Sequence, residues 1–180
     1  LMSMVPGTGE MKAWVGGINW QHFQYDHIKQ GKRQVGSTFK PFVYATAIMK
    51  LGMTPCSTVS NATYRKGTWT VEGSGGMLTL KDALAHSKNP VAVRLIEMTT
   101  PKRVIQTARD LGVTEEIPNE YAVALGSSDI TIYEMLGAYS TFANYGNYIK
   151  PEMIWRIEDA NGRVIKEVKP VLKEVMNELY

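Results

Sequence analysis

The six residues from Gly36 to Pro41, Gly-Ser-Thr-Phe-Lys-Pro, constrain the fold of this chain more than any other stretch. Ser37 and Lys40 are three positions apart, so on a helix their side chains project from one face, one turn from each other. A proline is tolerated in the first turn of a helix, because the N–H that it lacks has no partner there. The helix is therefore expected to begin close to Ser37. Residues 42–49 are apolar on nearly every side, which predicts a buried central helix that ends at Gly52.

This placement gives the Ser37 hydroxyl and the Lys40 amine the chemistry of a nucleophile and its base. The free N–H groups and the dipole at the start of a helix favour negative charge, and a serine hydroxyl needs an adjacent base to react at neutral pH. The alternative is that Ser37 is a helix cap and Lys40 a solvated surface lysine, which is the default interpretation of an isolated Ser-x-x-Lys pattern. Features elsewhere in the sequence are needed to distinguish these two interpretations.

Length and composition exclude several classes of function. A chain of 180 residues is enough for one domain with a sizeable core, and a scattered net charge of +3 gives no argument for nucleic-acid binding. No apolar run approaches the ~18 residues of a membrane-spanning helix. Cys56 is the single cysteine, so an internal disulfide is excluded, and His22 and His27 lack the spacing of metal ligands. The sequence predicts neither a metal site nor a cofactor.

Short strands separated by glycine-containing turns are expected at both ends of the chain. Near the N-terminus they are residues 1–5 and 10–16. Near the C-terminus, residues 152–168 predict a hairpin that turns at Asn161-Gly162, and residues 171–180 predict the beginning of a helix.

The middle of the chain predicts loops followed by short, capped helices. Residues 18–35 predict a loop, and residues 53–76, rich in Thr, Ser, Gly and Asn, predict another with one short strand at 67–71. Residues 73–76, Gly-Ser-Gly-Gly, are interpreted as a flexible turn, a shortened loop or an engineered linker. Cap residues then mark four helices: Thr79 with Asp82, Asn89 before Pro90, Thr100 before Pro101, and Thr131 with Glu134.

The junction between two of these helices carries a second motif, Ser87-Lys88-Asn89. The alternative to a functional interpretation is again capping, because Asn89 stands directly before Pro90. A short turn between helices is nevertheless a rigid position from which to present a hydroxyl and a carboxamide to a neighbouring site. Alone, this motif indicates no function, but together with the upstream Ser-x-x-Lys it favours a functional site.

With both motifs in place, the chain resembles the transpeptidase domain of class A (bifunctional) penicillin-binding proteins, a superfamily marked by S-x-x-K, S-D-N and K-T-G motifs. The resemblance covers nearly the whole chain and implies an α+β fold of the β-lactamase/transpeptidase type, with antiparallel sheet strands and a helical subdomain. It rests further on these stretches: Gly9-Glu10, Val15-Gly16-Gly17, Arg33-Gln34, Leu80 to Leu84, Ala124 to Ser127, Ala138-Tyr139, Phe142 to Asn144, and Pro151.

The chain also departs from the family pattern. Val35 replaces the proline usual before Gly-Ser, and residues 25–28, Tyr-Asp-His-Ile, replace a Phe-Asn-Arg-Ala type of run. No Lys-Thr-Gly or Lys-Ser-Gly occurs, and residues 66–68, Lys-Gly-Thr, have the wrong order and position. Residues 1–180 are therefore expected to be a partial transpeptidase domain without the third motif and the C-terminal strands. Such a domain should be weak or inactive alone and able to self-associate through an open sheet edge.

The resemblance implies a peptidoglycan DD-transpeptidase that cross-links D-Ala-D-Ala stem peptides and is acylated by β-lactams. Ser37 would be the nucleophile, Lys40 its base, Ser87 a proton relay to the leaving amine, and Asn89 a contact to the substrate backbone. The Ser37 N–H would supply one of the two oxyanion donors. The resemblance also implies a membrane-anchored parent with a glycosyltransferase domain, on the periplasmic or extracytoplasmic face of the bacterial cytoplasmic membrane.

Two alternatives stay open at this point. The same fold hosts DD-carboxypeptidases and β-lactamases, and class A β-lactamases add a glutamate that activates the deacylating water. The candidates for that glutamate here, Glu115, Glu116 and Glu120, lack a recognisable signature. The second alternative is a penicillin-binding or sensor module without turnover, which the missing third motif favours for the molecule as given.

Overall fold

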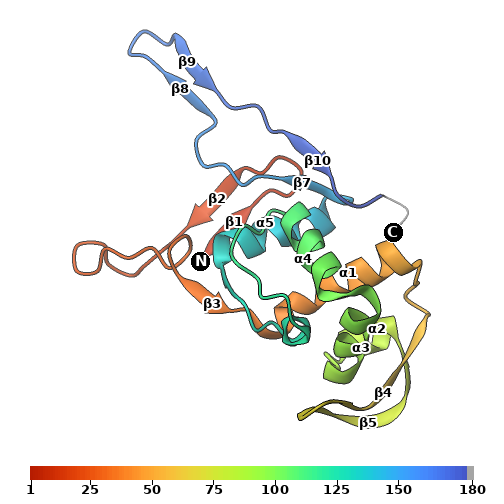
Figure 1. Cartoon of the computed structure of the whole chain (residues 1–180). Helices are drawn as coiled ribbons and strands as arrows, with labels where there is room; N and C mark the ends of the chain where they lie inside the picture. The colour runs from red at the N-terminus through yellow and green to blue at the C-terminus, as the bar shows by residue number, and fades with distance from the viewer. Residues whose placement is uncertain (178–180) are drawn as a thin grey trace. The chain divides into compact units, whose positions relative to one another are not determined.

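The computed structural model describes residues 1–177 of the chain, which form two compact units. Unit 1 contains Leu1–Lys32, Asp110–Thr114 and, of the described residues, 130–177. Unit 2 contains Arg33–Arg109 and Glu115–Asp129. Each unit combines helices with antiparallel strand pairing (Figure 1), in agreement with the expected α+β fold.

Unit 2 is built around helix α1 (Lys40–Leu51), which follows a 3-10 turn, η1, over Gly36–Phe39. The apolar run predicted a buried helix, and Phe42 and Val43 are indeed fully buried. The helix packs against α3 (Asn89–Thr99), whose apolar residues are buried as well. The remaining elements of this region are α2 (Leu80–Ala85), α4 (Pro101–Asp110), the 3-10 helix η2 (Tyr121–Leu125), β4 (Thr58–Lys66) and β5 (Trp69–Thr79), with β3 (Lys32–Gln34) and β6 (Asp129–Thr131) where the chain passes between the units.

The two ends of α1 compare differently with the prediction. The α-helix begins at Lys40 rather than near Ser37, because residues 36–39 form a 3-10 turn in which the Lys40 N–H donates to the Ser37 carbonyl. The C-terminal end lies where it was predicted. Gly52 has a φ of 64° and donates its N–H to the Ile48 carbonyl at 3.1 Å. Glycine adopts this left-handed conformation at little steric cost.

Two of the predicted capping pairs are confirmed. At the start of α2, the Thr79 side chain accepts the Asp82 N–H at 3.0 Å. At the start of α5 (Ile132–Ala143), the Thr131 side chain accepts the Glu134 N–H at 3.2 Å. Each bond satisfies one N–H group that the first turn of a helix otherwise leaves unpaired.

Strands β4 and β5 form a long antiparallel hairpin in a region where the sequence predicted a loop. The prediction of a loop over residues 53–76 with a single short strand is therefore wrong, and residues 73–76 lie within β5 rather than in a flexible turn or linker. The hairpin packs against α3. Such packing against a distant helix overrides a local composition that is poor in strand formers.

Close packing, and not flexibility, explains the glycine at position 73. A Cβ atom there would lie 2.0 Å from the Asn61 carbonyl oxygen and 2.9 Å from Cγ of Pro90. Only a hydrogen atom fits at this point of β5. Composition alone does not separate a glycine that provides flexibility from one that permits close approach.

Unit 1 carries α5 and strand pairs at both ends of the chain. β1 (Met2–Met4) and β2 (Met11–Trp14) pair antiparallel, as predicted. β7 (Asn147–Ile149) pairs antiparallel with β10 (Leu172–Glu174), so the prediction of a helix from residue 171 is wrong for the described residues, and residues 178–180 lie outside them. A partner strand about 25 residues away supplies the backbone hydrogen bonds of β10, and a local pattern cannot reveal it.

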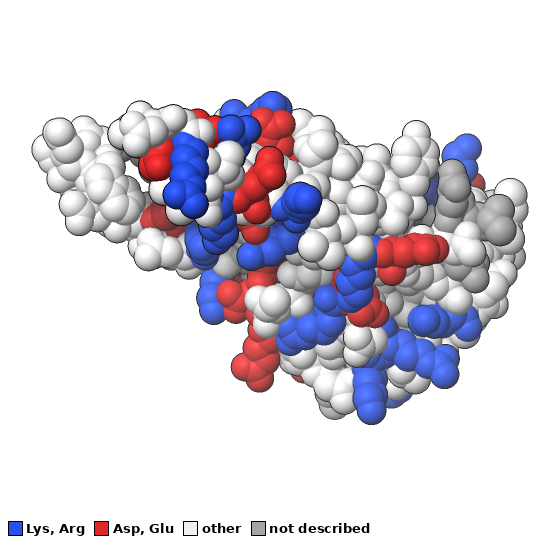
Figure 2. Space-filling view, turned by 90° about the horizontal axis from the view of Figure 1, so that it is seen from above, with Lys and Arg blue, Asp and Glu red and all other residues white. Residues whose placement is uncertain are grey.

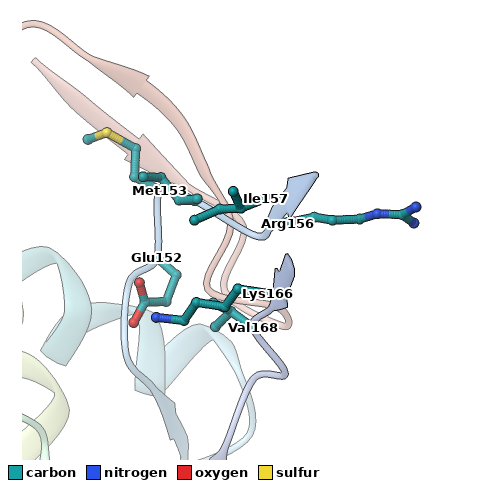
Figure 3. Close-up of a pocket in the computed structure, with 7 residues that line it drawn as sticks. Glu152, Met153, Arg156, Ile157, Lys166 and Val168 are labelled. Atoms are coloured by element: carbon teal, nitrogen blue, oxygen red, sulfur yellow. The ribbon is translucent and has the colours of Figure 1, made fainter. Parts of the chain in front are cut away.

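The predicted hairpin near the C-terminal end is present as β8 (Arg156–Glu158) and β9 (Val164–Glu167), with Gly162 in its turn at a φ of 80°. A pocket of about 270 Å³ lies beside it, lined largely by the hairpin and the residues before it. Figure 3 shows the side chains of Glu152 and Lys166 pointing toward each other there. None of the predicted site residues lines this pocket.

Charges of both signs are mixed on the surface. On the face that Figure 2 shows, Lys and Arg side chains lie among Asp and Glu side chains, consistent with the small net charge. Among the described residues, none of the helices has the length and apolar character needed to cross a membrane.

Gly73→Ala is expected to destabilise the chain by about 1–3 kcal/mol, because the added methyl group overpacks the contact between β5 and Asn61. Urea unfolding measures the difference. Gly7→Ala is the matched control, since its Cβ would meet its nearest neighbour, Asn144 Oδ1, at 3.8 Å. This control should change the free energy of unfolding by no more than about 0.5 kcal/mol. Equal losses in the two variants would contradict the packing argument.

Candidate active site

The side chain of Lys40 is the centre of the candidate site. It lies in the first turn of α1, is only 1% exposed, and donates hydrogen bonds from Nζ to three oxygen atoms in the α2–α3 turn and at the start of α3. These acceptors are the Ser87 carbonyl at 2.6 Å, Ser87 Oγ at 2.8 Å and Asn89 Oδ1 at 2.6 Å. An ammonium group has three N–H donors, so each donor has a partner. The structure thus brings Lys40, Ser87 and Asn89 together within unit 2.

Ser87 occupies an unusual backbone position in this turn. Its φ is 51°, a left-handed conformation that is costly for residues other than glycine. Its N–H donates to the Leu84 carbonyl at 2.9 Å, and the N–H of Lys88 donates to the Ala83 carbonyl at 2.8 Å. These two bonds form a Schellman motif that ends α2, and Ser87 stands where glycine is usually found. The strained residue is held from both sides, by the end of the helix and by the Lys40 ammonium.

The position of Asn89 decides against the capping interpretation. Asn89 is the first residue of α3, and the residue in the cap position is Lys88, which makes no side-chain capping bond. The Asn89 carboxamide oxygen instead faces Lys40. The prediction that Asn89 caps the helix that follows is therefore wrong, and its side chain is available to the site.

Ser37 differs from the other three predicted site residues in that it takes no part in the hydrogen bonds around Lys40. It lies exposed in η1, and in the part of the chain that the structure describes its hydroxyl makes no hydrogen bond with Lys40. The three N–H groups of the ammonium are already donated elsewhere, and a charged ammonium has no lone pair to offer. Lys40 can accept a proton from Ser37 only after it has lost one of its own.

Burial makes it easier for the Lys40 ammonium to lose a proton. Removal of the Lys40 side chain from water lowers its pKa from the ordinary value of 10.5, because a buried site disfavours the charged form. A lysine needs a lowered pKa before it can serve as a general base near neutral pH. The environment of Lys40 therefore shifts its protonation in the direction that the predicted chemistry requires.

Gly126 positions the turn that carries Ser37, although in the sequence it stands out only as part of the family-like stretch Ala124 to Ser127. The Gly36 N–H donates to the Gly126 carbonyl at 3.1 Å, and a Cβ on Gly126 would lie 1.9 Å from the Gly36 carbonyl oxygen. Gly126 also has a φ of 74°. The signal in the sequence was a glycine in Ala-Leu-Gly-Ser, but the neighbour that requires it is 90 positions away.

Other candidate residues lie outside this arrangement. Lys66, from the misordered Lys-Gly-Thr, lies at the turn of the β4–β5 hairpin, where Tyr121 and Glu97 raise its pKa. Of the three candidate glutamates, Glu120 accepts a hydrogen bond from Ser127 at 3.4 Å, and the acceptors of Lys40 Nζ lie on Ser87 and Asn89 rather than on a glutamate. The described chain also holds no group of three His, Cys, Asp or Glu side chains placed to bind a metal ion.

Comparison with known proteins places this geometry in a family. Residues 3–179 match the penicillin binding protein transpeptidase domain. Penicillin-binding protein 1A of Aquifex aeolicus is 37% identical over 98% of this chain, and that of Pseudomonas aeruginosa is 33% identical over 94%. The chain covers 25% and 22% of these two proteins, so it spans about a quarter of the length of its curated relatives.

Solved structures show the same fold. Penicillin-binding protein 1A from Haemophilus influenzae matches with a TM-score of 0.84 and 28% identity, over 95% of this chain and 27% of that one. PonA1 from Mycobacterium tuberculosis in complex with penicillin V matches with a TM-score of 0.87 and 24% identity, over 98% of this chain and 51% of that one. The second likeness, at low identity, concerns the fold alone.

The strain at Ser87 can be measured with two substitutions that both remove Oγ. Ser87→Gly relieves the left-handed backbone strain, whereas Ser87→Ala keeps it, so the glycine variant should be more stable than the alanine variant by about 1 kcal/mol. Urea unfolding compares the two directly. A glycine variant that is no more stable than the alanine variant would show that the φ of 51° carries no cost here.

Proposed function

Because this chain belongs to the family of penicillin-binding protein transpeptidase domains, we propose that it contributes the serine acyl-transfer site of a peptidoglycan DD-transpeptidase. The observation that carries the proposal is the buried Lys40 ammonium, hydrogen-bonded to Ser87 and Asn89 one helical turn from Ser37. A helix cap and a solvated lysine would leave Lys40 in water. The alternative interpretation of the Ser-x-x-Lys pattern, a helix cap with a solvated lysine, therefore lacks support.

The proposed reaction follows from the chemistry of the four side chains. Neutral Lys40 accepts the hydroxyl proton of Ser37, and Oγ forms a bond to the carbonyl carbon of the penultimate D-alanine of a stem peptide. The C–N bond to the terminal D-alanine breaks, and the proton passes from Lys40 through Ser87 Oγ to the leaving amine. An amine of a second stem peptide then attacks the acyl-enzyme and restores Ser37. The bond of 2.8 Å between Lys40 Nζ and Ser87 Oγ supports this proton route.

The carboxamide of Asn89 has an acceptor and a donor group, and each has its own role in this scheme. Its Oδ1 accepts from Lys40, so its amide N–H₂ group remains a donor for a backbone carbonyl of the substrate. The Ser37 N–H is the proposed first oxyanion donor. Because the sequence holds no Lys-Thr-Gly to supply a second one, we propose that acylation of the isolated chain is slow, by about 10²–10³ for one lost donor.

The setting of the reaction is also a proposal. We propose that the parent protein is membrane-anchored, carries a glycosyltransferase domain and works on the extracytoplasmic face of the bacterial membrane. The names of the relatives and the fraction of their length that this chain spans support it. The two-stranded ladders of the described chain, such as β4–β5, have edges that could pair with a second copy, in support of the proposed self-association.

Incubation with a fluorescent penicillin, followed by intact-mass and peptide mass spectrometry, tests the acyl-transfer site. The expected result is a slow, stable adduct on Ser37 that is absent in Ser37→Ala. Released, hydrolysed penicillin with continuous turnover would favour the β-lactamase alternative. No adduct after prolonged incubation, with Ser37 intact, would contradict the proposal and favour a module without acyl transfer.

The pH dependence of this acylation tests the role of Lys40. The rate should rise with pH as Lys40 loses its proton, with a midpoint below 10.5, because burial lowers the pKa of this side chain. Lys40→Arg should abolish the adduct at each pH, since a guanidinium stays charged. Adduct formation is followed by mass spectrometry and corrected for spontaneous penicillin hydrolysis. A flat profile, or a midpoint at or above 10.5, would rule out neutral Lys40 as the base.

A further inference from the structure

Strand β8 pairs with β9 alone, so one of its two edges is open in the part of the chain that the structure describes. The hairpin that the two strands form projects from the other elements of unit 1 (Figure 1), and every residue of both strands is exposed. An open edge presents unpaired N–H and C=O groups to which another strand can bind. The proposed acyl transfer uses no residue of this hairpin.

The backbone groups on the open edge belong to Arg156 and Glu158. The Trp155 carbonyl accepts an N–H from the returning chain at 2.8 Å, and the Asp159 N–H donates to the same side at 2.9 Å. Backbone groups of successive residues point to opposite sides of a strand, so those of Arg156 and Glu158 point away from β9. The bulge of the hairpin adds a residue to β9 and leaves β8 regular.

The sequence of β8, Arg-Ile-Glu, is complementary to itself when two copies run antiparallel. With Ile157 of both copies on a two-fold axis, Arg156 of each copy lies opposite Glu158 of the other. These opposite residues exchange backbone hydrogen bonds and bring opposite charges together across the strands. Within one copy the two side chains already form an ion pair. The dimer therefore joins four charges in one network, which stabilises more than an isolated surface pair.

Ile157 gives this contact an apolar centre. Its side chain is 41% exposed, and Met153 and Ile154 beside it are 56% and 59% exposed. Figure 3 shows the side chains of Arg156 and Ile157 pointing in opposite directions, as expected for neighbours on a strand. In the antiparallel pair the two isoleucines form a non-hydrogen-bonded pair, with Cα atoms about 4.5 Å apart, which removes apolar surface from water.

The other short strands with charged residues lack this self-complementarity. Antiparallel self-pairing of β3 or β10 about the middle residue would set Arg33 or Lys173 opposite its own copy, and like charges directly opposite each other are unfavourable. Self-pairing of β9 would set Lys166 opposite Ile165, which leaves the charge unmatched. Among these strands, charge complementarity selects β8.

We propose that β8 is a docking edge for a second copy of this chain, and that the two β8 strands pair antiparallel about Ile157. The inference rests on the proposed self-association and names the edge that carries it, and it requires no acyl transfer. A contact of three strand residues from each copy is small compared with a permanent interface. We therefore expect a dimer that forms reversibly as the concentration rises.

Sedimentation equilibrium from about 10 µM to about 1 mM measures this association. Arg156→Glu and Glu158→Arg each set like charges opposite each other, so each should weaken the dimer at least about fivefold. Glu72→Arg, at an exposed glutamate on β5 in unit 2, is the matched control for the change in net charge. It should leave the dissociation constant within about twofold of that of the unchanged chain.

Two combinations restore the complementarity and give the sharper test. The double variant with both Arg156→Glu and Glu158→Arg should dimerise as the unchanged chain does. An equimolar mixture of the two single variants should form a heterodimer, because one β8 strand then carries two acidic side chains and the other two basic ones. In a mixture of labelled and unlabelled chain, a nuclear Overhauser effect between the Ile157 Hα protons of the two copies should report the antiparallel pair directly.

Absence of a dimer at the highest concentration would overturn the inference. Single variants that dimerise normally, combinations that fail to restore the dimer, or an equal loss in Glu72→Arg would overturn it as well. Urea unfolding of each variant checks that the fold is intact. Ser37→Ala should dimerise normally, so a failure of acylation is distinguishable from a failure of the docking edge.

Discussion

The structure of the site depends on one buried cation. Lys40 is 1% exposed, and an ammonium transferred out of water is tolerated only where hydrogen-bond acceptors replace the lost solvent. Ser87, in the turn between α2 and α3, and Asn89, the first residue of α3, supply three oxygen atoms. The lysine thereby ties the start of α1 to that turn, and it explains why Ser87 keeps a φ of 51° in a position where glycine is usual.

The bonds that stabilise the ammonium also restrain the chemistry. In the charged state Lys40 donates its three N–H groups in hydrogen bonds to Ser87 and Asn89, which leaves no donor for Ser37 and no lone pair to accept a proton from it. Burial acts in the opposite direction, because it lowers the lysine pKa and favours the neutral form. The site is thus a balance between acceptors that hold a proton on Lys40 and an environment that helps to remove it. Backbone strain such as that of Ser87 is common at functional turns, and it persists because neighbouring contacts fix the strained residue.

The sequence predicted the features that depend on local spacing. The buried central helix, its end at Gly52, the caps at Thr79 and Thr131 and the hairpin turn at Gly162 follow from short-range rules, and the structure has them. Features set by distant partners were missed. The β4–β5 hairpin, the strand β10 and the contact of Gly126 with Gly36 depend on residues far along the chain. Asn89 shows the limit most clearly, because its sequence context fits a cap equally well and only the buried lysine decides its role.

The most direct test of this account is the pKa of Lys40 itself, read from the ¹³Cε chemical shift of labelled lysine and assigned with Lys40→Arg. The account predicts a titration midpoint below 10.5, and below those of the exposed lysines in the same spectrum, because burial disfavours the charged form. A midpoint at or above 10.5 would mean that the three acceptors outweigh burial. Lys40 would then be a structural cation, and the base for Ser37 would have to be sought elsewhere.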